Sequence, residues 1–531
     1  QVGDPFAEKL LIEASLELIE GGLVEGLQDL GAGGIACATS ETADRAGTGM
    51  AIDLDAVPRR EPGMAAFEVL ISESQERMLA IVRPDREAAV REVCERWGLP
   101  CATIGRVTDD GDIAVREGGR EIVRVPARAL TSDAIVHDRL ATAPSRRRAA
   151  PAPGAPMDPV GRLPERGMDP GAVLMALLGS ANLASCRPVY EQYDSTVGVN
   201  TVVGPGHGAA VLRIKGTSRA LVASTDANAA VGGLDPWLGA AMSVAEATRN
   251  VAITGARPLG VTNCLNFGDP TRPEAFWQLA EAVRGLGDAC RALGLPVTGG
   301  NVSLYNESPA GAILPTPEIG VVGLLEDVAA LVGPAFAARG DAVLLVGEAN
   351  PGLAGSEYAR LAGAAAEDGP PPLDLERERR LQVFAREAAA RGLAASIQDV
   401  SGGGLAVALA ECAIWGGIGA ALRVPVAHSP AVDLFGESPS RVVVTARPRH
   451  APALELLARQ HGLPVERLGI TGGDRLVIEL AGAGATGAAE ERGSRVADPI
   501  DIAVRDLVHT WEHGLARALD WEAPASAPEG R

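Results

Sequence analysis

The 531-residue sequence has little of several features that would place it in a familiar functional class. Aromatic residues make up only 3%, and none of the seven scattered cysteines forms a Cys-x-x-Cys pair, which argues against a zinc site or a disulfide framework. No apolar run reaches the length that spans a membrane. The formal net charge of -20 disfavours nucleic acid and anionic membranes as main partners. We therefore expect a globular protein of a reducing compartment, the cytoplasm.

Two common phosphate-binding signatures are also missing. The sequence contains neither a Walker-type phosphate loop nor the glycine fingerprint of dinucleotide-binding domains. A nucleotide would therefore have to bind to a less common fold. No cysteine stands beside a suitable histidine in a nucleophile motif, so catalysis by a thiol is not expected either.

An internal duplication is the most informative feature that is present. Residues 25–38 (EGLQDLGAGGIACA) match residues 395–408 (ASIQDVSGGGLAVA), and residues 73–105 match 437–469 at a constant offset. Two matched segments in the same order indicate a duplicated domain. Within each copy, apolar residues at helical spacing alternate with short apolar runs suited to buried strands, which predicts an α/β (α+β) fold.

The duplication sets the expected domain organisation. The chain begins within a recognisable pattern, so we expect a further domain before Gln1 and a complete order of A–B–A–B. The expected parts are a first copy over 1–140, a linker rich in Ala, Pro and Arg over 141–159, a different domain over 160–332, a second copy over 333–520 and a disordered tail over 521–531.

A Gln-Asp pair precedes a glycine cluster in both copies, as Gln28-Asp29 and Gln398-Asp399. Glycines let backbone amides approach phosphate oxygens, and an aspartate beside them can hold a divalent cation. The alternative is a strand-turn-helix corner whose glycines only meet backbone requirements. Retention of the acid in both copies favours function.

A second polar cluster, Ser72-Glu-Ser-Gln-Glu-Arg77, comes just before an apolar strand-like run. It could recognise hydroxyls or a carboxamide on a ligand, or it could be a salt-bridged strand edge. The second copy keeps Glu437, Ser438 and Arg441 but replaces Gln75-Glu76 by Pro439-Ser440. We interpret this asymmetry as a difference in task, with one copy possessing a structural role.

The middle domain carries the string TGGNVSLYNE at 298–307. Gly300 offers a backbone approach to phosphate, Asn301 a neutral oxygen ligand and Ser303 a hydroxyl. Upstream, Glu246 and Asn250 are four residues apart, so on a helix they share one face and could share a metal ion. A solvated helix surface is the alternative explanation of that pair.

Six strings together resemble one family, phosphoribosylformylglycinamidine synthase in its small bacterial-type synthetase form, which has the fold of aminoimidazole ribonucleotide synthetase. They are QVGDPFAEKLLIEA (1–14), QDLGAGG (28–34), ISESQERML (71–79), EQYDSTVGVNT (191–201), NCLNFGDP (263–270) and TGGNVSLYNE (298–307). The resemblance implies a purine-biosynthetic ligase. It implies that ATP phosphorylates the amide oxygen of formylglycinamide ribonucleotide to an iminophosphate, and that ammonia displaces the phosphate. It also implies magnesium, a glutaminase subunit (PurQ) and a small bridging subunit (PurS).

Roles follow from the resemblance by position. Substrate contacts fall on Gln1, Glu73, Ser74, Gln75 and Ser303; ATP contacts on Asn263 and Gly300; magnesium ligands on Asp29 and Asn301; and metal ligands of an auxiliary nucleotide site on Glu246, Asn250 and Asp399. Asn263 stands where the family pattern has an aspartate. The family's catalytic histidines belong to the first A domain, so no catalytic residue is expected here. We expect no synthetase activity from this chain alone; the alternative is a non-catalytic scaffold or nucleotide-binding remnant.

Overall fold

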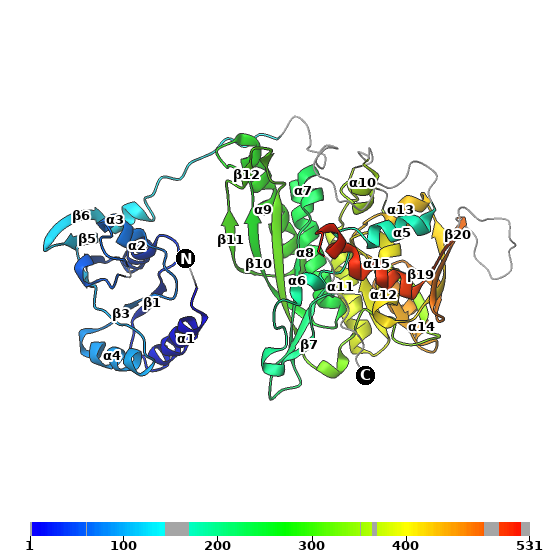
Figure 1. Cartoon of the computed structure of the whole chain (residues 1–531), viewed down its shortest axis with the longest axis horizontal. Coiled ribbons are helices and arrows are strands. Elements are labelled where there is room, and N and C mark those ends of the chain that lie inside the picture. Colours follow the sequence, from blue (N-terminus) through cyan, green and yellow to red (C-terminus); the bar gives the residue numbers. More distant parts are fainter. Residues whose placement is uncertain are drawn as a thin grey trace. The chain divides into compact units, whose positions relative to one another are not determined.

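The computed structural model describes residues 3–59, 61–143, 169–350, 352–363, 369–482 and 499–521. It divides into two compact units, Gln1–Asp138 and Arg139–Arg531, which we call unit 1 and unit 2 and describe separately (Figure 1). Gln1, most of the expected linker and nearly all of the expected tail lie outside the described residues. None of the described helices is both long and apolar enough to cross a membrane.

Unit 1 contains one copy of the duplicated domain. Its first helix begins at Pro5 because the Asp4 carboxylate accepts hydrogen bonds from the amides of Phe6 and Ala7. Two sheets follow, an antiparallel β1-β3 pair and a four-stranded sheet in the order β4-β2-β5-β6. The elements are α1 (Pro5–Glu20), β1 (Gly26–Asp29), α2 (Gly34–Ala46), β2 (Gly49–Asp53), α3 (Ala66–Ile71), β3 (Met78–Ile81), α4 (Glu87–Arg96), β4 (Gly105–Thr108), β5 (Asp112–Glu117) and β6 (Arg120–Pro126).

The first half of unit 2 is a six-stranded sheet in the order β11-β10-β14-β9-β8-β7, against which α8 and α9 pack (Figure 1). Nearly every residue of α8 is buried, which makes it the central helix of the unit. The elements are α5 (Pro170–Leu178), α6 (Arg187–Tyr190), β7 (Thr201–Val203), β8 (Ala210–Arg213), β9 (Ala220–Asp226), α7 (Ala229–Leu234), α8 (Pro236–Ile253), β10 (Arg257–Asn266), α9 (Pro273–Leu293), β11 (Val297–Ser303), β12 (Glu307–Ser308), β13 (Gly311–Ala312) and β14 (Thr316–Leu325).

The second half of unit 2 is built on a seven-stranded sheet in the order β16-β18-β15-β19-β17-β20-β21. Both α11 and β16 contact α8, so the two halves share an interface. The expected boundary at 332–333 falls inside unit 2, just before β15. The elements are β15 (Ala342–Val346), α10 (Glu357–Ala362), α11 (Leu375–Ala390), β16 (Ser396–Asp399), α12 (Gly404–Gly416), β17 (Ala420–Val426), α13 (Pro430–Phe435), β18 (Val442–Ala446), α14 (Ala451–Gln460), β19 (Val465–Thr471), β20 (Arg475–Gly482), β21 (Ile500–Ala503) and α15 (Val504–Ala518).

The two copies repeat one another in strand register as well as in order. Asp29 at the end of β1 lies opposite Met78 of β3, and Asp399 at the end of β16 lies opposite Val442 of β18. In the second copy β15 pairs with both β18 and β19 and makes one continuous sheet. Among the described residues of unit 1 no strand joins β3 to β4, so its sheet is in two parts. The expected α/β class is confirmed.

Candidate functional site

In unit 1 the chain leaves β1 at Asp29 and turns through a glycine loop into α2. The two carboxylate oxygens of Asp29 accept hydrogen bonds from the Gln28 side chain (3.0 Å) and from the Gly31 amide (3.1 Å). Gly33 has φ of +70°, a left-handed conformation that favours glycine. A Cβ on Gly34 would lie 2.2 Å from the Ser72 carbonyl oxygen, so glycine at this position lets the chain at Ser72 lie against the start of α2.

Two side chains tie the loop at 72–77 to this glycine loop, an arrangement that we call the loop clamp. The Glu73 carboxylate accepts a hydrogen bond from the Gly33 amide at 3.0 Å. The Arg77 guanidinium donates to the carbonyl oxygens of Ser74 (2.8 Å) and Ser72 (2.6 Å). The structure thus brings one expected magnesium ligand, Asp29, and three of the expected substrate residues, Glu73, Ser74 and Gln75, to one edge, and all four are exposed. We call this set of Asp29, Glu73, Ser74 and Gln75 the unit 1 rim.

The second copy has the same loop clamp in a buried setting. The Glu437 carboxylate accepts a hydrogen bond from the Gly403 amide at 2.8 Å. The Arg441 guanidinium donates to the carbonyl oxygens of Ser438 (3.2 Å) and Gly436 (2.7 Å). Asp399, the counterpart of Asp29, is only 3% exposed. The sequence match between the copies therefore reflects conserved hydrogen bonds, whereas the exposure of the loop differs.

Arg249 of α8 accounts for this difference. Its Nε lies 2.5 Å and its Nη2 3.3 Å from the two oxygens of Asp399, and its Nη1 lies 2.8 Å from the Glu378 carboxylate. Glu378 also accepts hydrogen bonds from Ser440 (2.5 Å) and Gln382 (2.9 Å). The guanidinium is almost completely buried, so these two carboxylates compensate a charge that water does not reach.

Two of the expected auxiliary ligands, Glu246 and Asp399, lie beside the same guanidinium. Glu246 is 3.8 Å from Arg249, and Asn250 on the next turn is 8% exposed. Gly208 lies so close to Asn250 that a Cβ there would come within 2.6 Å of its side-chain oxygen. Glu246 and Asp399 are therefore both ion-pair partners of Arg249. Within the described residues, no three His, Cys, Asp or Glu side chains are grouped so that they could hold a metal ion.

Sequence reasoning missed Asp226, Arg249 and Glu378. Burial raises the pKa of Asp226 to about 7, and the charge of Asp399 adds to the effect. The sequence did contain a signal for Arg249. It is a charged residue between Glu246 and Asn250, in a helix whose other residues are mostly small or apolar. Asp226 and Glu378 carried no such local signal, since their partners are distant in the sequence.

The remaining expected residues lie on the parallel strands β10 and β11. Asn263 pairs with Gly300, and a Cβ on Gly300 would lie 2.3 Å from the Asn263 side-chain oxygen, so this approach favours glycine. The next register pair is Cys264 with Asn301, whose side chains are 3.7 Å apart. Because side chains alternate along a strand, Asn301 and Ser303 lie on the face opposite to Asn263.

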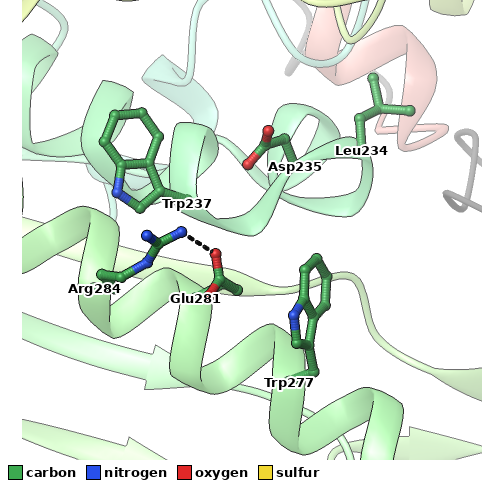
Figure 2. Close-up of a pocket in the computed structure, with 6 residues that line it drawn as sticks. All are labelled: Leu234, Asp235, Trp237, Trp277, Glu281 and Arg284. Atoms are coloured by element: carbon green, nitrogen blue, oxygen red, sulfur yellow. Dashed lines mark hydrogen bonds and ion pairs between the residues drawn. The ribbon is translucent and has the colours of Figure 1, made fainter. Parts of the chain in front are cut away.

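A separate pocket lies where α7, α8 and α9 meet. Figure 2 shows Trp237 and Trp277 on either side of the Glu281–Arg284 ion pair. The Trp237 indole donates a hydrogen bond to Asp288 at 2.8 Å, which anchors one wall. Leu234 and Asp235 complete the lining. None of the expected substrate, ATP or metal residues is among the lining residues.

Comparison with known families agrees with the duplicated architecture. The family model described as "AIR synthase related protein, C-terminal domain" matches residues 1–118 and again 338–480. The model described as "AIR synthase related protein, N-terminal domain" matches residues 206–325. The fold and the repeated glycine loops therefore define an AIR synthase-related protein.

Individual relatives show which family within the AIR synthase-related class the chain resembles. Subunit PurL of phosphoribosylformylglycinamidine synthase from Moorella thermoacetica is 48% identical over 482 residues, covering 91% of this chain and 65% of the relative. The PurL subunit from Thermomicrobium roseum is 45% identical, with 98% and 68% covered. The structure of Thermotoga maritima PurL complexed with ATP matches with a TM-score of 0.61 at 29% identity, covering 89% and 68%. The chain belongs to the phosphoribosylformylglycinamidine synthase PurL family, and it spans 65% of the length of the first relative.

Proposed function

We propose that this chain is part of an ATP-dependent ligase that converts formylglycinamide ribonucleotide to the corresponding amidine in purine biosynthesis, by way of an iminophosphate. Two observations on relatives support the substrates: Thermotoga maritima PurL has been solved complexed with ATP and complexed with FGAR, the formylglycinamide ribonucleotide. The chain is 29% identical to that protein. The non-catalytic scaffold is the alternative.

The main structural support for this proposal is the arrangement of the unit 1 rim. The loop clamp uses Glu73 to hold the Gly33 amide and leaves Ser74 and Gln75 exposed at the surface. A hydroxyl and a carboxamide can each donate and accept hydrogen bonds, as a ribonucleotide with hydroxyl and amide groups requires. Glu73 then acts mainly by fixing the loop, while Ser74 and Gln75 contact the substrate.

The rim also fits a magnesium ion. Each oxygen of the exposed Asp29 carboxylate accepts one protein hydrogen bond, which leaves further lone pairs for a cation. In unit 2, Asn301 offers an amide oxygen on the exposed strand β11, with Ser303 as the substrate contact and Asn263 and Gly300 as the ATP contacts. When bound, magnesium neutralises the charge of the transferred phosphoryl group.

The second copy serves a structural purpose in this proposal. Asp399 is occupied by the buried Arg249 guanidinium, which already supplies the positive charge that a cation would bring. Glu246 lies 3.8 Å from the same guanidinium. We assign the ligand-binding role to Asp29 and the interface role to Asp399.

Two partners complete the proposed enzyme. A PurLQS structure from Thermotoga maritima, similar to this chain with a TM-score of 0.62, supports an assembly of several subunits. We propose that ammonia comes from a glutaminase subunit (PurQ) and that a small subunit (PurS) bridges the two. In the sequence no cysteine stands beside a suitable histidine in a nucleophile motif, which is consistent with such a division of labour.

Calorimetric titration with formylglycinamide ribonucleotide tests the proposed substrate. We expect the unaltered chain to bind it and Gln75→Ala to bind at least about tenfold more weakly, because loss of one or two direct hydrogen bonds costs about 1–3 kcal/mol. Glu121→Ala, at an exposed position of β6, serves as the matched control and should bind normally. Absence of binding to the unaltered chain, or equal binding by Gln75→Ala, would contradict the proposal and favour the scaffold alternative.

A further inference from the structure

Two cysteines of unit 1, away from the rim, lie next to one another. Helix α4 ends beyond Cys94, and the chain reverses at Gly98, which has φ of +67°. The Leu99 amide donates to the Cys94 carbonyl oxygen at 2.8 Å and closes the turn. The returning chain lies against α4, where the Arg91 guanidinium donates to the Cys101 carbonyl oxygen at 3.2 Å. Arg91 lies one turn before Cys94 on the same face of α4, so this contact places Cys101 beside the face of the helix that carries Cys94.

The second copy shows that the fold does not need sulfur at these positions. There the Leu463 amide donates to the Ala458 carbonyl oxygen at 3.0 Å, again beside a glycine, Gly462, with φ of +65°. The same turn thus carries Ala458 and Val465 where the first copy carries the two cysteines. Aliphatic side chains satisfy the packing, so the pair of thiols is a chemical property confined to unit 1.

The surroundings of the two thiols differ. Cys101 is exposed, whereas Cys94 is half-buried beside Trp97 and Leu99. The Arg91 side chain lies against this turn, so a positive charge stands beside the two cysteines. Cys101 is therefore suited to react first with an external oxidant, and Cys94 is placed to react with the sulfur of Cys101 afterwards.

We propose that Cys94 and Cys101 form a reversible disulfide and are a modification site for low-molecular-weight disulfides such as glutathione disulfide. The Cys101 thiolate attacks one sulfur of glutathione disulfide, forms a mixed disulfide and releases one glutathione thiolate. The Cys94 thiolate then attacks the Cys101 sulfur and releases the second glutathione. The protein loses two protons and two electrons in all, and glutathione disulfide is reduced to two glutathione molecules.

The bond would join α4 to the segment that leads into β4. Helix α4 packs with α1 in one apolar cluster, while β4 is the edge strand of the four-stranded sheet. The crosslink would therefore restrict the connection between two parts of unit 1 whose sheets are separate. Closing so short a loop limits the unfolded chain, and we expect the oxidised unit 1 to unfold a few degrees higher.

Incubation of the purified full chain with glutathione disulfide, followed by intact mass and peptide mapping, tests the proposal. We expect the loss of two hydrogens, located to a peptide pair containing Cys94 and Cys101, and recovery of both thiols with dithiothreitol. Burial and the neighbouring Cys101 raise the pKa of Cys94 to about 11, so closure should accelerate with pH.

Two variants copy the residues of the second copy, Cys94→Ala and Cys101→Val. We expect a stable glutathione adduct at Cys101 in the first and no adduct or bond at this turn in the second. Cys186, exposed in unit 2, serves as an internal control that should form only an adduct. An unaltered chain that accumulates the Cys101 adduct without closing the bond overturns the proposal, and this result needs no variant to fold.

Discussion

The two copies of the duplicated domain use the same hydrogen bonds around their glycine loops and differ in what faces the aspartate. In unit 2 the buried Arg249 guanidinium pairs with Asp399, whereas in the described part of unit 1 Asp29 is exposed and accepts hydrogen bonds from its neighbours Gln28 and Gly31. The loop clamp is thus a scaffold that is compatible with either surrounding. The comparison teaches that a repeated motif preserves geometry, while the neighbouring helix decides whether its acid is available to a ligand.

Removal of Arg249 should have the largest effect on this comparison. Arg249→Met leaves Asp399 and Glu378 buried without their counter-charge, and breaking a buried ion pair in this way costs about 3–5 kcal/mol. We expect the free energy of unfolding of unit 2 to fall by that amount. Denaturant titration followed by tryptophan fluorescence measures it, because every tryptophan except Trp97 lies in unit 2.

Arg45→Met is the matched control for this prediction. Arg45 forms an exposed ion pair with Glu41 on α2, so its loss should change stability by less than about 1 kcal/mol. If Arg249→Met is as stable as this control, Asp399 is not held by charge compensation, and the proposed structural role of the second copy is wrong.

The aspartates themselves give the next largest difference. Asp399→Asn turns an amide group toward the buried guanidinium and removes one of its three carboxylate partners, so we expect a loss of about 2–4 kcal/mol. Asp29→Asn, at the exposed counterpart, should change stability by about 0.5 kcal/mol or less. Thermal unfolding monitored by circular dichroism compares the two variants. Equal destabilisation by both would remove the distinction between an open and an occupied copy.

The duplication, the α/β class and the loop residues could be predicted from the sequence because they depend on local patterns. The Gln-Asp pair and the last two glycines, Gly33-Gly34 and Gly403-Gly404, are the same in both copies, and strand and helix patterns flank them. Glu73 and Glu437 could likewise be matched by their spacing. Each of these features occurs twice within one chain, so the match between the two copies supports the assignment of the loop residues.

The surroundings of the loops could not be predicted in this way. Arg249 is separated in sequence from both Asp399 and Glu378, and the contact exists only because α8 packs against β16 and α11. The opposite orientation of Asn263 and Asn301 depends on a strand register that the sequence does not specify. The roles of these residues in ligand binding stay predictions.

The smallest expected difference concerns the glutamates of the two loop clamps and depends on pH. Burial raises the pKa of Glu437 to about 7, although the amides of Gly403 and Glu357 donate to its carboxylate. A carboxyl whose pKa is higher in the folded state favours folding most when it is protonated. Its contribution is therefore full below the unfolded pKa, near 4.5, and is lost as the pH rises to about 7.

Glu437→Gln should remove this pH dependence, since glutamine keeps an oxygen acceptor for both amides without a charge. Because each unit of raised pKa is worth about 1.4 kcal/mol, we expect the variant to gain about 2–3 kcal/mol in stability relative to the unaltered chain between pH 4.5 and pH 8. Glu73→Gln makes the matched change in the exposed loop clamp and should shift stability by less than about 0.5 kcal/mol at both pH values. Denaturant titrations at pH 4.5 and pH 8 measure all three proteins. If Glu437→Gln shows no gain with pH, its carboxylate is as well solvated as that of Glu73, and the contrast between a buried and an exposed clamp does not extend to the glutamates.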